Sequence, residues 1–157
     1  MHWRATFVLA VLLPASAHAQ TVRHLALGYG SQSSYQHPNF VTAEFGHAAP
    51  KGWLVAGTAR HSSWNGMSGW RAQLTVQRSL DVGTFRAYTG AGPSWTNEDG
   101  EGDWSASEFG AMVLLGLESP ALRAGHGAVR VFGELDAYTH DYATGQVLFG
   151  VRWQFAH

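Results

Sequence analysis

Apolar and polar positions alternate along most of the chain, in runs of about ten residues that are separated by turn-forming segments. The last run is the clearest, because its odd-numbered positions from Val147 to Phe155 are all apolar, while the positions between them include Arg152 and Gln154. A period of two places the two sets on opposite faces of a β-strand. Eight runs follow this pattern, at residues 24–29, 40–45, 53–60, 70–77, 85–91, 108–118, 129–137 and 147–155.

The segments between the runs alternate in length over most of the chain. The long and polar ones are Ser31–Asn39, His61–Gly69 and Pro93–Ala106. The intervening segments 48–52 and 79–83 are short. Long loops at one end and short turns at the other are typical of outer-membrane β-barrels. Two later connections depart from this rule, since 119–127 is longer and 139–145 is shorter than it predicts.

Alternation alone does not decide which face of a barrel is apolar. A water-soluble barrel encloses its apolar set, whereas a membrane barrel turns that set toward lipid. Here the polar set contains arginines matched to carboxylates, and the only lysine, Lys51, lies in a turn. Matched charges suit a closed interior, where an unpaired charge is costly. We expect an interior charge network of Glu44, Arg60, Arg71, Arg86, Glu108, Glu118, Arg130, Glu134, Asp136 and Arg152.

Aromatic residues support the membrane arrangement, because the apolar set carries them at the ends of the runs. They are Trp53, Trp70, Phe85, Phe109, Trp153 and Phe155. Aromatic girdles flank the apolar band of membrane barrels. The sequence therefore predicts an all-β fold, a single antiparallel up-and-down transmembrane β-barrel of eight strands over residues 20–157. Side chains fill the interior of a barrel of this size, so we do not expect a pore.

The first nineteen residues predict a cleaved signal peptide, so that the domains are 1–19 and 20–157. Arg4 precedes a short apolar run, and Ala17-His18-Ala19 has the small residues of a cleavage site. The apolar run is shorter than the ~20 residues of a membrane-spanning helix. The expected location is the bacterial outer membrane.

Composition excludes several classes of function. The chain has 10 basic and 11 acidic residues, and this balance gives no reason to expect a nucleic-acid partner. It has no cysteine, so disulfides, thiol catalysis and cysteine metal sites are excluded.

In its alternation, length and terminal aromatic, the chain resembles the small outer-membrane barrels of the OmpA-like and OmpX-like group. The resemblance implies outer-membrane lipid, lipopolysaccharide and the barrel-assembly machinery as partners, and a monomer as the oligomeric state. It also implies that Phe155, the last aromatic of the final strand, is an assembly signal, although Ala156 and His157 follow it.

His61 and Ser63 are the candidate catalytic residues, because they form an H-x-S pattern that resembles part of the motif of lipid A deacylase barrels. A serine nucleophile needs an imidazole base, and the base needs an orienting carboxylate, for which Glu108 or an acidic loop residue is the candidate. The pattern departs from the motif because Trp64 intervenes before Asn65, and because it closes an early run. A polar loop explains the same residues.

We expect no metal and no cofactor. The acidic segment Asn97–Asp103 lacks the full spacing of a calcium loop and is interpreted as a solvated loop tip. The scattered histidines have no metal-ligand spacing; they are His24, His37, His47, His126, His140 and His157.

Three functional hypotheses remain open. The first is a non-enzymatic outer-membrane barrel with a structural or surface-interaction role and a packed, charged interior. The second is a lipid-A-modifying hydrolase that uses His61 and Ser63. The third is a soluble periplasmic barrel that binds a small ligand.

Overall fold

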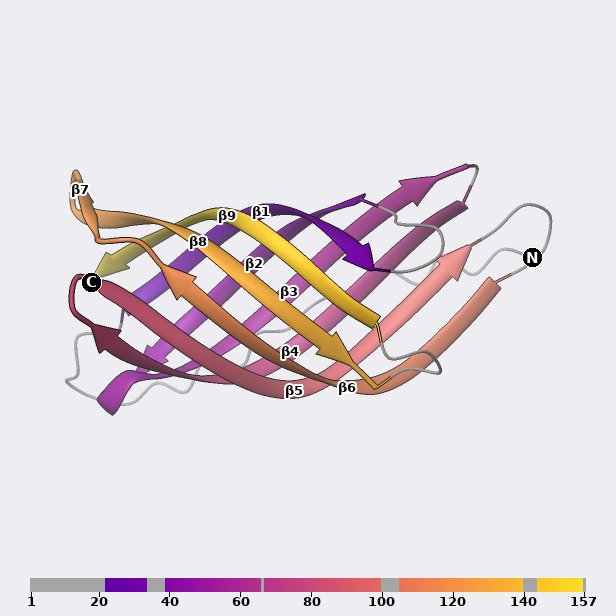
Figure 1. Ribbon diagram of the computed structural model, residues 1–157, viewed down its shortest axis with the longest axis horizontal. Coiled ribbons are helices and arrows are strands. Elements are labelled where there is room, and N and C mark those ends of the chain that lie inside the picture. Colours follow the sequence, from indigo (N-terminus) through magenta and orange to yellow (C-terminus); the bar gives the residue numbers. More distant parts are fainter. Residues whose placement is uncertain (1–21, 34–38, 66, 100–104, 140–143, 157) are drawn as a thin grey trace.

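The computed structural model describes residues 22–33, 39–65, 67–99, 105–139 and 144–156. They form one antiparallel sheet that curves into a barrel (Figure 1). Its strands are β1 (Val22–Ser33), β2 (Asn39–Ala49), β3 (Trp53–Trp64), β4 (Met67–Val82), β5 (Phe85–Asp99), β6 (Ser105–Glu118), β7 (Leu122–Ala124), β8 (Gly127–Tyr138) and β9 (Thr144–Ala156). A single 3-10 turn, η1 (Pro50–Gly52), joins β2 to β3.

Neighbouring strands pair in chain order, and two long-range pairings close the barrel. β1 pairs with β9 along its whole length, and β6 pairs with β8 from Met112↔Tyr138 to Glu118↔Phe132. Because β7 has only three residues, the wall consists of eight long strands. The predicted all-β, eight-stranded up-and-down barrel is therefore confirmed.

β7 explains why the connection 119–127 is longer than a turn. Ser119 donates its backbone N–H to the Val131 carbonyl at 2.8 Å, and its hydroxyl accepts the Val131 N–H at 3.0 Å. β7 then pairs with the start of β8, and Gly125 turns the chain at a φ of 58°. Glycine suits this conformation because it has no Cβ. The connection is thus a bulged continuation of β6 ending in a tight hairpin.

Two connections predicted as loops are largely strand, which corrects the sequence interpretation. The β3–β4 register continues to Trp64↔Met67, and the β5–β6 register continues to Asp99↔Ser105. The polar residues of these segments resemble a loop in sequence, but a strand with water on both faces does not need an apolar set. Figure 1 shows these two hairpins reaching beyond the end of β8. We call residues 61–65, 67–69, 96–99 and 105–110 the hairpin extension.

The faces have the polarity that the aromatic and charge patterns predict. Large apolar side chains point outward and stay exposed, as with Leu27 at 60 % and Phe149 at 64 %. The inward positions carry most of the buried polar residues together with two small apolar clusters around Phe132 and Tyr138. This is the reverse of a water-soluble barrel, so the hypothesis of a soluble periplasmic barrel is wrong in its main structural expectation.

The two ends of the barrel differ. We call the end with η1, Gly83 and the β7–β8 hairpin the turn end, and the opposite end, which carries the hairpin extension, the loop end. Within the described ranges, no helix is long and apolar enough to cross a membrane.

Candidate functional site

The interior of the barrel holds two clusters of charged side chains. The turn-side cluster consists of His24, Glu44, Glu118 and Arg152, and all four are buried. Arg152 donates from Nη2 to Glu44 Oε1 at 2.7 Å and from Nη1 to Glu118 Oε1. His24 Nε2 lies 2.7 Å from the same Glu44 oxygen. One guanidinium therefore joins two carboxylates from different walls of the barrel.

Strand register explains how Arg152 reaches Glu44 across an intervening strand. Ala26 of β1 is the register partner of Glu44 on β2 and of Arg152 on β9. All three have the inward parity, which means that they belong to the alternate strand positions whose side chains point into the barrel. The short side chain of Ala26 leaves space above it. The long arginine extends over that space to the carboxylate.

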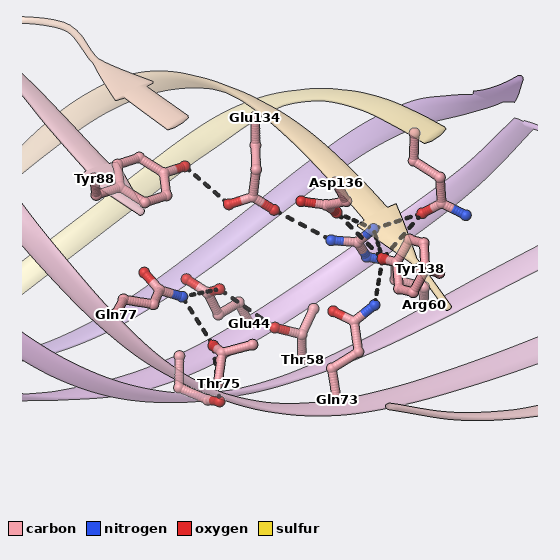
Figure 2. Close-up of polar contacts among 12 residues, drawn as sticks. Glu44, Thr58, Arg60, Gln73, Thr75, Gln77, Tyr88, Glu134, Asp136 and Tyr138 are labelled. Atoms are coloured by element: carbon pink, nitrogen blue, oxygen red, sulfur yellow. Dashed lines mark hydrogen bonds and ion pairs between the residues drawn. The ribbon is translucent and has the colours of Figure 1, made fainter. Parts of the chain in front are cut away.

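The loop-side cluster is centred on Arg60 and includes Gln73, Glu134, Asp136, Tyr138 and Gln146 (Figure 2). Arg60 Nη1 lies 2.5 Å from Asp136 Oδ2 and donates to Gln146 Oε1 at 2.6 Å. Its Nη2 donates to Glu134 Oε1 at 3.2 Å. A planar guanidinium can satisfy several acceptors at once in this way, which a lysine ammonium does less well.

Tyr138 anchors the same cluster from β8. Its hydroxyl accepts hydrogen bonds from Arg60 at 2.7 Å and from Gln73 Nε2 at 2.6 Å. The Arg71 guanidinium stacks over its ring at 4.2 Å from the centroid. These contacts join β3, β4 and β8 through the lumen.

A narrow gap separates the two clusters. Glu44, Arg60 and Glu134 line a cavity of about 10 Å³, which is room for about one water molecule. Next to the cavity, Tyr88 donates to Glu134 Oε2 at 3.0 Å, and on its wall Thr58 donates to Glu44 at 3.3 Å. At these levels the lumen is filled by side chains, as in other barrels of eight strands.

All predicted network residues except Glu108 fall into three groups. Glu44, Arg60, Glu118, Glu134, Asp136 and Arg152 are buried in the two clusters. Arg71 is partly buried and donates to Thr96 at 3.0 Å. Arg86 and Arg130 lie at the rim of the turn end, 3.9 Å and 3.6 Å from Glu118 Oε2.

Glu108 corrects the predicted network. It has the same parity as Glu118 on β6, but it is exposed. The β6–β8 pairing begins only at Met112, so Glu108 lies on the hairpin extension, where the wall no longer surrounds it. Parity predicted its face correctly but did not predict where the barrel ends.

Several interior residues were missed. His24 lies in the predicted run 24–29 but was left out of the expected charge network, and Tyr138, at the end of β8, lies just beyond the predicted run 129–137. Gln73, Gln77 and Gln146 are buried as well. All of them have the parity opposite to the apolar set, so inward phase was the available signal.

His61 and Ser63 lie on the outward face of β3, away from the charged interior. The His61 ring packs against Trp70 with centroids 4.5 Å apart, and Ser63 is exposed. In the described part of the chain no hydrogen bond joins the two side chains. Glu108 cannot orient His61, because its parity places it on the opposite face of the sheet, three strands away. The structure therefore brings the two residues to one face and places Glu108, the first candidate carboxylate, on the other.

Metal ligands show no clustering in the described ranges, where no group of three histidine or acidic residues could hold an ion. Asn97, Glu98 and Asp99 of the acidic segment are the end of β5, and its remaining residues lie outside the described ranges.

Solved structures of similar shape supply the comparison that decides the fold family. The N-terminal barrel domain of Pseudomonas aeruginosa OprF aligns with a TM-score of 0.66 and 13 % identity, over 84 % of this chain and 97 % of that one. Neisserial surface protein A aligns with a TM-score of 0.62 and 12 % identity, over 84 % and 95 %. The chain has the fold of the small bacterial outer-membrane barrels.

A third barrel of this fold has been solved with a bound ligand. Ail of Yersinia pestis, in complex with the heparin analogue sucrose octasulfate, aligns with a TM-score of 0.54 and 13 % identity, over 87 % of this chain and 100 % of that one. No protein-family model matches the chain, and no curated protein sequence is similar to it. The predicted resemblance is thus confirmed for the fold, and the function has to be argued from this chain's own residues.

Proposed function

We propose that the protein is an outer-membrane barrel with a non-enzymatic, structural or surface-interaction role, delivered by a signal peptide cleaved after Ala19. The observation that carries this proposal is the polarity of the wall: an apolar outward band around an interior of buried, paired charges. Lipid accepts such a band, and closure of the barrel satisfies every strand edge inside the membrane. Water would favour the opposite arrangement.

The loop end is the part suited to interactions at the cell surface, since the longer connections of membrane barrels lie on the extracellular side. Its segments 31–39, 61–69, 93–108 and 139–145 contain no lysine or arginine. They contain six acidic residues: Glu98, Asp99, Glu101, Asp103, Glu108 and Asp141. The surface role therefore favours a basic partner and disfavours a sulfated polyanion of the kind bound to Ail.

Cell fractionation tests the membrane assignment. After expression of the full-length chain, we expect the mature protein, which starts at Gln20, in the outer-membrane fraction. It should resist alkaline extraction and migrate differently on a gel before and after boiling. Recovery of the protein in the soluble periplasm would contradict the proposal.

Binding measurements test the surface role separately. Protein in outer-membrane vesicles should retain poly-lysine in a salt-dependent manner and should not retain heparin. Retention of heparin, with no retention of poly-lysine, would contradict the surface role and leave the membrane assignment intact.

A further inference from the structure

The turn end of the barrel has the opposite charge from the loop end. Arg23, Lys51, Arg78, Arg86, Arg123 and Arg130 all lie in or beside its strand ends and turns. Asp81 is an acidic residue at this end, and it pairs with Arg86 at 3.2 Å. Most of these basic groups are exposed or have partners. Arg23 and its neighbour His47 differ because each has, on the outward face of this end, a buried polar atom without a hydrogen-bond partner in the part of the chain that the structure describes.

Arg23 of β1 and His47 of β2 are register partners, so their side chains lie side by side. Both have the outward parity of Leu25 and Phe45, the next positions toward the middle of the band. Both are partly buried. Arg23 Nε and His47 Nδ1 are shielded from solvent and have no hydrogen-bond partner among the described residues. A buried polar atom without a partner is costly, so the pair gains from a side-chain rearrangement that brings its N–H groups to the acceptor oxygens of a ligand.

The surroundings of this pair are those of a membrane interface. Phe155 is the register partner of Arg23 on the other side. Trp153, one outward position nearer the middle of β9, is 50 % exposed. Trp and other aromatic rings gather at the level of lipid headgroups, where one end of the ring is apolar and the other is wet.

We propose that Arg23 and His47 form a binding site for the phosphate of a phospholipid headgroup in the leaflet at the turn end, an inference that rests on the proposed membrane function. A guanidinium and an imidazole N–H donate to phosphate oxygens, and such charge-assisted bonds are strong in a partly dehydrated place. The acyl chains would lie along Leu25 and Phe45 of the apolar band.

Other basic residues of the same end do not have this geometry. The Arg78 guanidinium is stacked over Trp53, 5.2 Å from the ring centroid. Lys51 lies in η1 at a φ of 63° and is exposed. Loss of the Lys51 charge therefore serves as the control for unspecific attraction between a basic surface and anionic lipid.

A titration of the refolded full-length protein in uncharged detergent micelles tests the site. The probes are short-chain phosphatidylglycerol and, separately, inorganic phosphate, followed by amide chemical shifts. We expect saturable shifts at Arg23 and His47 with the lipid. We expect about tenfold weaker binding in Arg23→Gln with His47→Gln, a change of ~1.4 kcal/mol. Lys51→Gln should bind like the original protein.

Three results for the original protein and the Lys51→Gln control would overturn the site. They are linear shifts spread over all basic residues of this end, an equal loss in Lys51→Gln, and inorganic phosphate binding as tightly as the lipid. Barrel formation is scored first, by the gel shift on boiling, in every variant. A variant that forms the barrel but binds lipid unchanged refutes the site alone, whereas a protein that never enters micelles refutes the membrane function.

Discussion

Two carboxylates on neighbouring parts of the barrel show how enclosure decides what a charge does. Glu134 and Glu108 both have inward parity, on strands β8 and β6. Glu134 is 4 % exposed and contacts Arg60 and Tyr88 across the lumen. Glu108 is exposed because it lies on the hairpin extension, beyond the end of β8. The same alternation thus produces a structural charge in one region and a surface charge in the other.

The largest expected effect is on the free energy of unfolding, which should fall when Glu134 is replaced but not when Glu108 is replaced. Glu134→Ala leaves the Arg60 guanidinium with one carboxylate fewer and removes the acceptor of the Tyr88 hydroxyl. Breaking a buried pair in this way costs about 3–5 kcal/mol. Unfolding of the protein by guanidinium chloride in lipid vesicles should show a decrease of that size in its free energy of unfolding.

Glu108→Ala is the matched control, because it removes the same group from the same face of the sheet. Its free energy of unfolding should stay within ~0.5 kcal/mol of the original protein, as for other surface changes. Equal losses in the two variants would contradict the division into an enclosed part and an extension.

The second prediction concerns assembly at the turn end. Phe155 lies on β9 with its ring edge-on to Trp153, at a centroid distance of 6.0 Å. If barrel-assembly machinery reads this terminal aromatic, Phe155→Ala should reduce the heat-modifiable, membrane-inserted form several-fold in cells. Deletion of Ala156 and His157 should change it little.

Refolding in vesicles without cell machinery distinguishes assembly from stability. Phe155→Ala should refold there nearly as well as the original protein, since an aromatic at the lipid interface adds only part of its burial energy. Full insertion of Phe155→Ala in cells would contradict the assembly-signal interpretation.

A smaller effect is expected at the loop end. Neutralising Glu98, Asp99 and Glu108 to their amides removes three of the six acidic residues of the surface segments. Binding of poly-lysine should weaken a few-fold at low salt and converge with the original protein at high salt, because exposed charges are screened. Solid-phase binding at two ionic strengths measures this, and unchanged binding at low salt would contradict an electrostatic surface role.

Much of the fold could be predicted because the two faces of each strand meet different environments. Parity placed Glu44, Arg60, Asp136 and Arg152 together before any contact was known. It did not give the ends of strands, because polar residues such as Ser62 and Ser63 pair as well in a solvated hairpin as they fill a loop. Tyr138, whose ring contacts Arg71 and whose hydroxyl contacts Arg60, was not predicted as an interior residue, because aromatic residues were interpreted as part of the outward set.

The smallest expected effect is that of Ser63→Ala, and it addresses the hydrolase hypothesis. Ser63 and His61 share the outward face of β3, but His61 packs on Trp70, and Glu108, the first of the candidate orienting carboxylates, belongs to the other face. A serine nucleophile needs an imidazole base and a carboxylate that orients this imidazole. Overexpression of the original protein and of Ser63→Ala should therefore leave the mass spectrum of lipid A the same as in cells without the gene. Loss of an acyl chain with the original protein, abolished by Ser63→Ala, would instead establish catalysis at this pair and displace the non-enzymatic role.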